Sequence, residues 1–238
     1  LVGSEMCIRD RVSEVGSYFS IIKAIAAGNH KLSTIAAVLE VKSTNLTKYL
    51  KTLMDLDILE RRVPVTEGNP EKSKRGLYKI KDNYLRFWFA FIYPNMSFIE
   101  SGHSGIVMDK IRKGLTTSHI GFVYEDICEE RMWELNVNNT WPFQFSKLGG
   151  YWDAKNEIDI AALDPEGKNL ILGECKYWKE PVGLNVLHAL ETKACDVAWE
   201  RDRRKVWYVL FSISGFSDEL RNHAATRDDL LLIDDGER

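Results

Sequence analysis

Apolar and polar residues alternate most regularly in two neighbouring runs, at residues 157–164 and 170–176. A period of two residues is typical of β-strands, because successive side chains of a strand point to opposite faces. The segment 164–169 between the runs contains Pro and Gly, which favour a turn between two hairpin strands. The alternation therefore predicts a β-hairpin in this part of the chain.

The polar face of this predicted hairpin carries three candidate catalytic residues, Asp159, Glu174 and Lys176. Glu174 and Lys176 share one face of the second strand, and we expect the hairpin to place Asp159 beside them on an exposed surface. Two neighbouring carboxylates repel each other, and a hard divalent cation such as Mg²⁺ or Mn²⁺ relieves that repulsion through oxygen ligands. Such a metal polarises a phosphodiester and supplies its nucleophile, while a lysine assists the attacking water or steadies a phosphate oxygen. A solvated strand face with one ordinary Glu–Lys pair is the alternative.

Helical periodicity dominates the first third of the chain. Apolar positions three and four residues apart predict three helices, at residues 17–27, 33–39 and 43–54. Two β-like runs follow, at residues 59–65 and 76–80. Three helices followed by a hairpin are the element order of a winged helix-turn-helix. We therefore predict a winged helix-turn-helix domain over residues 12–80.

This predicted domain carries the candidate nucleic-acid-binding residues. Its third helix could enter a DNA major groove, and basic residues of the wing could contact phosphates. The candidates are Thr44, Asn45, Thr47, Lys48 and Lys51 on the helix and Arg61, Arg62, Lys72, Lys74 and Arg75 on the wing. Asp55 and Asp57 weaken the basic surface, and an adapter between proteins or domains is the alternative role.

The remaining patterns predict a helical connector and a second domain. Residues 81–120 are rich in aromatic residues, which favour core or interdomain packing over base stacking, and no chemistry is assigned to them. From residue 121 onward a helix is followed by a strand at 143–148 that turns at Gly149–Gly150, and then by the hairpin. A helix at 184–199 carries Lys193, which could reach the candidate site, and further strands follow at 204–212 and 230–233.

Composition restricts the alternatives. The 238 residues are 45% hydrophobic, which is enough for one large or two small cores, and the net charge of −3 gives no general sign of nucleic-acid binding. The sequence contains no run of about 18 apolar residues, so no transmembrane helix is predicted. Three cysteines beyond residue 11, without CxxC spacing, favour reduced thiols, a cytoplasmic protein and no zinc site. No P-loop, HExxH or GxSxG motif is present.

Several short motifs, in their order along the chain, resemble the C-terminal region of archaeal and bacterial AAA-type ATPases, which is known mostly as a domain of unknown function. Among them, Asp159 followed by Glu174-Cys175-Lys176 at the end of a hydrophobic strand resembles the D…ExK signature of the PD-(D/E)XK nuclease superfamily. The other similar segments lie at residues 85–89, 93–95, 121–125, 149–152 and 157–160.

The resemblance implies a restriction-endonuclease-like fold for residues 121–238, an α+β or α/β mixed sheet flanked by helices. It also implies a metal-coordinating acid on the helix before the hairpin. Glu125 matches that acid by position, and Glu129, one turn later, is the second choice. The alternative is that Glu125 only interacts favourably with the helix dipole. An ATPase domain that precedes this segment is implied as well.

Residues 1–11 have a separate explanation. One reverse translation of this segment gives the end of a transposase-type sequencing adapter, so we exclude it from fold reasoning and expect the natural protein to begin before Val12.

These observations predict a metal-dependent DNA phosphodiesterase domain with a winged-helix DNA-binding module, at the C-terminal end of a larger ATPase. Glu125, Asp159 and Glu174 would hold Mg²⁺ or Mn²⁺, and Lys176 would assist the attacking water. A catalytically weak or silent module that binds DNA or a partner protein is the main alternative. A winged-helix transcription regulator is a third, which leaves the acidic cluster unexplained.

Overall fold

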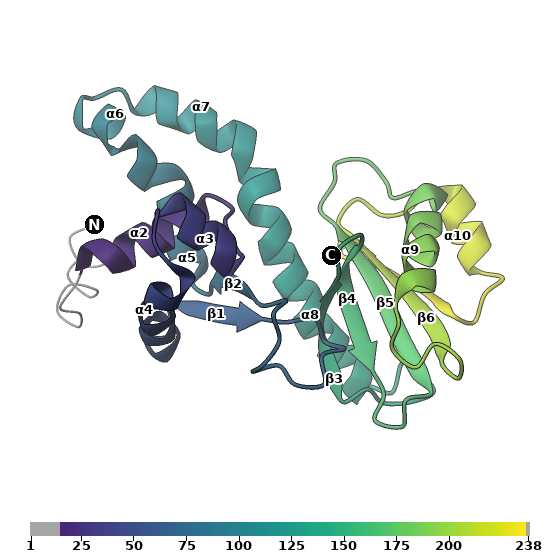
Figure 1. Ribbon diagram of the computed structural model, residues 1–238. Helices are drawn as coiled ribbons and strands as arrows, with labels where there is room; N and C mark the ends of the chain where they lie inside the picture. Colours follow the sequence, from purple (N-terminus) through teal and green to yellow (C-terminus); the bar gives the residue numbers. More distant parts are fainter. Residues whose placement is uncertain (1–14, 237–238) are drawn as a thin grey trace. The chain divides into compact units, whose positions relative to one another are not determined.

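The computed structural model describes residues 15–236 (Figure 1). Residues 1–11, for which we expect an adapter origin, lie outside this range. The chain divides into two compact units, of which the first comprises described residues 15–62 and 74–114 and the second comprises residues 63–73 and 115–236. None of the helices in this range has the length and apolar composition needed to cross a membrane.

The first unit begins with three helices and an antiparallel strand pair. These elements are α2 (Val15–Ala26), α3 (Leu32–Val38), α4 (Ser43–Asp55), β1 (Leu59–Arg62) and β2 (Leu77–Ile80). Isoleucines of α2 and leucines of α4 are fully buried against each other, as the helical periodicity predicts. The predicted order of elements is confirmed, whereas the assignment of this unit as a winged helix stays a prediction.

The aromatic segment after β2 packs into the same core. Asp82 caps α5 (Asn83–Phe87) by accepting a hydrogen bond from the Leu85 N–H at 2.7 Å. The helical chain continues through η1 (Trp88–Ile92) and η2 (Tyr93–Asn95), and Trp88 and Phe89 are buried against α2 and α4. The prediction that the aromatic residues of this segment serve packing is confirmed for Trp88, Phe89 and Phe91, whereas Tyr84 is exposed. Two further helices follow, α6 (Met96–Glu100) and α7 (Ser104–Leu115).

The second unit is built on a five-stranded mixed sheet of order β3-β4-β5-β6-β7. Its strands are β3 (Lys147–Trp152), β4 (Glu157–Leu163), β5 (Asn169–Lys176), β6 (Lys205–Ser212) and β7 (Leu230–Asp234). The first three strands pair antiparallel, and β5, β6 and β7 run parallel because helices connect them. The mixed sheet flanked by helices agrees with the coarse fold class predicted from the sequence.

Helices cover both faces of this sheet (Figure 1). On one face, η3 (Thr116–Ile120) leads into α8 (Gly121–Val137), whose Cys128 and Met132 pack on Ile160 and Ile171. On the other face, α9 (Leu184–Asp196) and α10 (Asp218–Ala224) pack on a layer that includes Leu172. From Ile160 onward in β4, and along β5, alternate residues therefore face α8 and α9 in turn.

The strand expected at residues 143–148 begins only at Lys147, and the turn expected at Gly149–Gly150 is wrong. The side chain of Asn136 accepts a hydrogen bond from the Phe145 N–H and donates one to its carbonyl oxygen, both at 3.0 Å, so this backbone cannot join the sheet. Strand β3 instead passes through both glycines, with a shift of register against β4 between Gly149 and Tyr151. Glycines inside a strand are typical of such a bulge.

Candidate functional site

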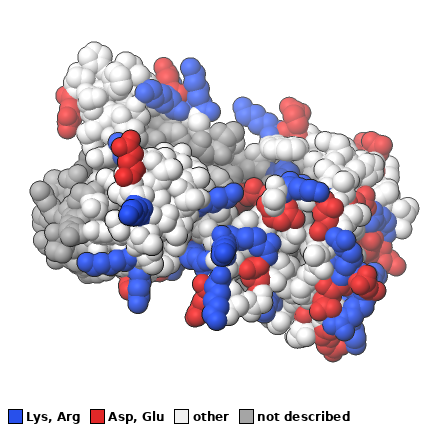
Figure 2. Space-filling view, in the orientation of Figure 1, with Lys and Arg blue, Asp and Glu red and all other residues white. Residues whose placement is uncertain are grey.

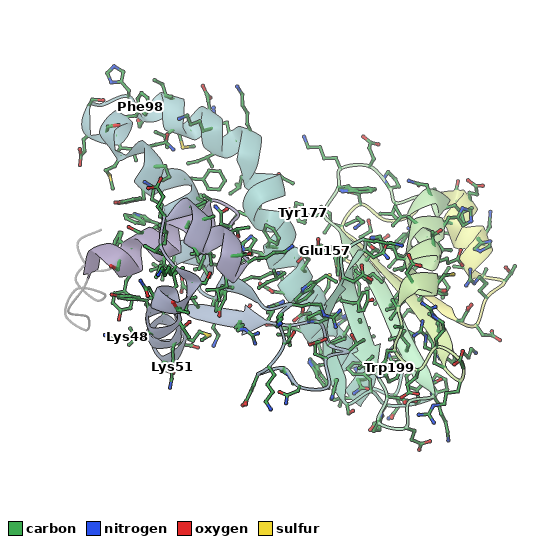
Figure 3. All side chains as sticks on the ribbon, viewed as in Figure 1. Lys48, Lys51, Phe98, Glu157, Tyr177 and Trp199 are labelled. Carbon is green, nitrogen blue, oxygen red and sulfur yellow. The ribbon has the colours of Figure 1, made fainter. Side chains whose placement is uncertain are left out.

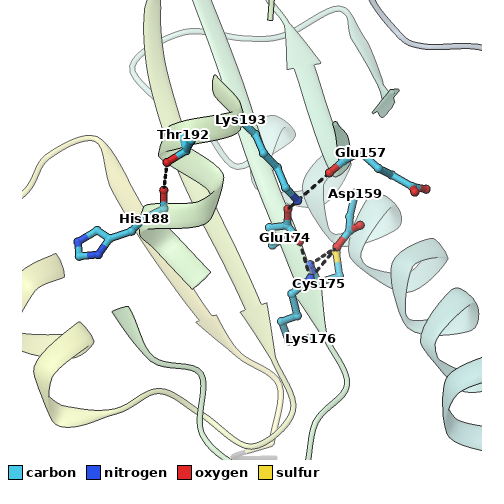
Figure 4. Close-up of polar contacts among 8 residues, drawn as sticks. All are labelled: Glu157, Asp159, Glu174, Cys175, Lys176, His188, Thr192 and Lys193. Atoms are coloured by element: carbon cyan, nitrogen blue, oxygen red, sulfur yellow. Dashed lines mark hydrogen bonds and ion pairs between the residues drawn. The ribbon is translucent and has the colours of Figure 1, made fainter. Parts of the chain in front are cut away.

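The candidate site lies where the pairing of β4 with β5 ends. The last paired residues are Ile160 and Gly173, and beyond them the Asp159 carboxylate takes over the role of a backbone partner. Its Oδ2 atom accepts hydrogen bonds from the Cys175 N–H at 2.9 Å and from Lys176 Nζ at 3.3 Å (Figure 4). The end of the hairpin thus fixes Asp159 directly beside the second strand.

Both carboxylate oxygens of Glu174 accept hydrogen bonds from lysines. Lys176 Nζ lies 2.5 Å from Oε2, and Lys193 Nζ, which comes from α9, lies 2.6 Å from Oε1. Lys193 also donates to the backbone carbonyl of Glu157 at 2.8 Å (Figure 4). Two acids from the hairpin and two lysines, one from β5 and one from α9, therefore form one continuous cluster, which we call the acid–lysine cluster.

This cluster is largely buried, so the exposed surface expected from the sequence is wrong. The side chain of Glu174 is 6% exposed, those of Asp159 and Lys176 are 18% exposed, and that of Lys193 is 29% exposed. The reason is that α9 covers the face of β5 to which Glu174 points, and Lys193 extends from that helix over the carboxylate.

Burial and charge act in opposite directions on the acids. Burial by itself would raise the pKa of Glu174, but its ion pairs with Lys176 and Lys193 outweigh burial and lower the pKa. For Asp159, burial and the nearby Glu174 charge raise the pKa against the opposing effect of Lys176. Burial would lower the pKa of Lys176, but the two carboxylates raise it. Glu174 is thus the carboxylate that the lysines hold ionised.

The third predicted metal ligand, Glu125, lies on α8. Burial first, then the neighbouring Cys128 thiol and the charges of Asp159 and Glu125, raise the pKa of the Cys175 thiol. The charge of Glu125 is therefore close enough to β5 to act on Cys175, the residue next to Glu174. Across residues 15–236, no three His, Cys, Asp or Glu side chains are gathered closely enough to hold a metal ion. The three-ligand set with Glu125, and Glu129 as its second choice, stay predictions.

The chemistry of the two remaining acids fits a divalent cation. Asp159 and Glu174 present hard oxygen donors from adjacent strands, as Mg²⁺ prefers. Each of them is already bonded to a lysine, however, and Glu174 to two. The sequence correctly predicts that Asp159, Glu174 and Lys176 lie together. For Lys193 it predicts only a helix residue that could reach the site, and not the direct contact with Glu174.

The predicted nucleic-acid-binding residues are divided between the two units. On α4 the five candidates are exposed and lie opposite the buried leucines, and Lys48 and Lys51 point away from the helix (Figure 3). The five candidates on α4 are Thr44, Asn45, Thr47, Lys48 and Lys51. Their outward orientation agrees with the helical periodicity, and DNA binding by them stays a prediction.

The candidates on the predicted wing differ in their surroundings. Arg62 Nε forms an ion pair with Glu60 at 2.5 Å, which offsets its charge. Lys72 lies in the segment 63–73, which belongs to the second unit. This segment contacts the sheet, because the Val65 N–H donates a hydrogen bond to the Gly150 carbonyl at 3.0 Å. Among the described residues, basic and acidic side chains are intermixed on the face shown in Figure 2.

A pocket of about 350 Å³ opens beside the second unit's sheet, next to α8. Tyr177, which directly follows Lys176, lines it together with Tyr124, and their rings are 5.7 Å apart. The charged residues of its lining are Glu130, Arg131, Glu134 and Asp235. Because three acids outnumber the single arginine in its lining, this pocket is unsuited to a phosphate backbone.

Comparison with known proteins places the candidate site in a shared segment. Residues 88–194 match the family model DUF234, described as "Archaea bacterial proteins of unknown function", and this segment contains Asp159, Glu174, Lys176 and Lys193. An uncharacterized protein of Methanocaldococcus jannaschii is 41% identical over 167 residues, which are 70% of this chain. The chain spans 37% of the length of that relative.

Among solved structures, the chain is similar to a repair endonuclease from Pyrococcus abyssi. The similarity covers 45% of each chain with 10% sequence identity and a TM-score of 0.29. A TM-score of this size does not establish a common fold. The comparisons thus show that residues 88–194 are similar to the DUF234 family, whose function is unknown.

Proposed function

We propose that the second unit is a metal-dependent DNA phosphodiesterase domain of the PD-(D/E)XK type, joined to a winged-helix DNA-binding module in a larger ATPase. The observation that carries this proposal is the meeting of Asp159, Glu174 and Lys176 within hydrogen-bond distance at the end of one hairpin. Two acids and a lysine on adjacent strands combine the ligands of a hard cation with a group that can orient a water or a phosphate.

Each residue has a distinct role in this proposal. Asp159 and Glu174, with Glu125 as a third acid, would hold Mg²⁺ or Mn²⁺, which when bound would polarise the phosphodiester and lower the pKa of water. The Cys175 N–H fixes the Asp159 carboxylate, so this ligand is oriented before any metal arrives. Lys176, which contacts both carboxylates, would bind the attacking water or a phosphate oxygen.

The test is calorimetric titration of Mn²⁺ into the full chain and into Asp159→Ala, followed by cleavage assays on duplex, single-stranded and branched DNA. We expect Asp159→Ala to lose metal binding and cleavage while its circular dichroism stays close to that of the parent. Lys176→Ala should retain metal binding but lose cleavage. If the Asp159 variant bound Mn²⁺ and cut DNA as well as the parent, the proposed site would be wrong.

One observation favours a second candidate function, a silent module that binds DNA or a partner. Glu174 has both oxygens bonded to lysines, and the acid–lysine cluster of two acids and two lysines is electrically balanced without a metal. A self-sufficient cluster of this kind can be purely structural. In that case the parent would bind no Mn²⁺ under any condition of the titration, with or without DNA.

A further inference from the structure

Lys193 holds a position that the three-residue D…ExK signature does not explain. It lies in the last turn of α9, next to the buried Ala194, and its ammonium group reaches across to β5. There it contacts Glu174 Oε1 at 2.6 Å and the Glu157 carbonyl at 2.8 Å (Figure 4). The helix thus delivers a second positive charge to a carboxylate that Lys176 already neutralises.

The balance of charges makes this second lysine a competitor for the site. Asp159 and Glu174 carry two negative charges, and Lys176 and Lys193 carry two positive ones. A divalent cation that entered this cluster unchanged would meet a neutral site and two neighbouring ammonium groups. Since like charges repel strongly at such distances in a poorly hydrated environment, the metal gains access to Glu174 only if a lysine withdraws.

The contacts indicate which lysine withdraws. Lys176 is 18% exposed and contacts both carboxylates, whereas Lys193 is 29% exposed and contacts only Glu174. Lys193 also keeps a hydrogen-bond partner, the Glu157 carbonyl, when it leaves the carboxylate. Of the two, Lys193 gives up the smaller interaction.

We propose that Lys193 closes the acidic pair in the metal-free protein and is displaced from Glu174 when a divalent cation binds. This inference rests on the proposed function, because it assumes that Asp159 and Glu174 are metal ligands. Lys193 is therefore a regulatory residue that acts through Glu174 and lowers the affinity of the site for metal. The released ammonium group stays beside the cluster, where a DNA phosphate is a suitable new partner.

The experiment is calorimetric titration of Mn²⁺ into the full chain and into Lys193→Met, which keeps the stem and removes the charge. We expect Lys193→Met to bind Mn²⁺ about tenfold more tightly than the parent, because the metal no longer displaces a charged hydrogen bond. Lys193→Arg retains the charge and should stay at or below the parental affinity. Lys179→Met removes an exposed lysine three residues after Lys176 in the sequence, and its effect should remain within about twofold.

Each outcome separates the two proposals. If the parent binds Mn²⁺, Asp159→Ala does not, and Lys193→Met equals the parent or binds more weakly, the metal site stands and the role of Lys193 is wrong. If neither the parent nor Lys193→Met binds Mn²⁺, both proposals fail. Circular dichroism verifies that each variant is folded, and Lys193→Gln, which keeps a hydrogen-bond donor without the charge, replaces Lys193→Met if the latter unfolds.

Discussion

Helix α9 contributes one charged residue to each of two ion-pair clusters, and the clusters differ in their cations and their burial. Lys193 joins the acid–lysine cluster, whereas Glu191, two residues earlier, joins Arg227 and Asp229. We call this second group the arginine cluster. Arg227 donates from Nε and Nη2 to the two oxygens of Asp229, at 2.8 and 2.9 Å, and from Nη1 to Glu191.

The arginine cluster has the features of a clamp. A planar guanidinium suits paired contacts with carboxylates, and one arginine here ties α9 to the segment before β7. The side chains of Glu191 and Asp229 are 29% and 27% exposed, so water shares in their solvation. The acid–lysine cluster instead buries Glu174 under two point-like ammonium groups, which other cations can replace. The arginine cluster stabilises the fold. The acid–lysine cluster holds charge in a place where stability alone does not require it.

The most severe way to break this contrast is to remove the buried charge. Glu174→Gln leaves two lysines beside an uncharged side chain, and breaking a buried ion pair on one side is costly. We expect the free energy of unfolding to fall by about 3 kcal/mol in urea denaturation. The matched variant Asp229→Asn in the arginine cluster should cost only about 1 kcal/mol or less. Equal losses in the two variants would remove the distinction between the clusters.

A second substitution tests the position of β5 and leaves its charged residues unchanged. Gly173 precedes Glu174, and a Cβ atom at this position would lie 2.6 Å from Val209 Cγ1 and 2.9 Å from the Val209 carbonyl oxygen of β6. Gly173→Ala must therefore push the two strands apart, and overpacking of this kind costs about 2 kcal/mol. The displaced Glu174 should also bind Mn²⁺ more weakly.

Gly105→Ala is the control for this substitution, because no described atom other than those of its chain neighbours and of its own helix backbone lies within 4 Å of the Cβ position at Gly105. Its free energy of unfolding should not fall, and it should leave Mn²⁺ binding unchanged. If Gly173→Ala were as stable as the parent, β5 and β6 would be more adaptable than their close approach indicates, and the position of Glu174 would not depend on Gly173.

The contrast between the clusters also shows how far the sequence could predict this molecule. A period of two placed Glu174 and Lys176 on one face of β5, and the predicted hairpin placed Asp159 beside them. It could not predict that Glu174 is buried, since burial depends on which helix covers that face. Lys193 is 19 residues from Glu174 in sequence, and no local pattern encodes their contact.

The error at residues 143–148 has a related cause. Periodicity describes side chains, whereas the strand is excluded there by the side chain of Asn136, which occupies the N–H and carbonyl of Phe145. A contact of this kind between a side chain and a distant backbone leaves no repeat in the sequence. Element order and faces could therefore be predicted, and the contacts that bury or redirect particular groups could not.

The smallest expected effect is the pH dependence of the stability that the arginine cluster contributes. Arg227 lowers the pKa of Asp229, so this carboxylate is more acidic in the folded chain than in the unfolded chain. A group with a depressed folded pKa stabilises the protein above its unfolded pKa, and the stabilisation is lost as the pH falls through the folded pKa. The difference in unfolding free energy between the parent and Asp229→Asn should thus be constant above about pH 5 and shrink below about pH 4.

The expected size of this difference is about 1 kcal/mol or less, because Asp229 remains partly exposed and solvent screens the pair. Arg227→Gln removes the same interaction from the other side, so its difference from the parent should shrink over the same acidic range. Urea denaturation at a series of pH values measures both differences. A difference for Asp229→Asn that grew as the pH fell would mean that Asp229 is destabilised by its surroundings, and the arginine cluster would then not be a clamp.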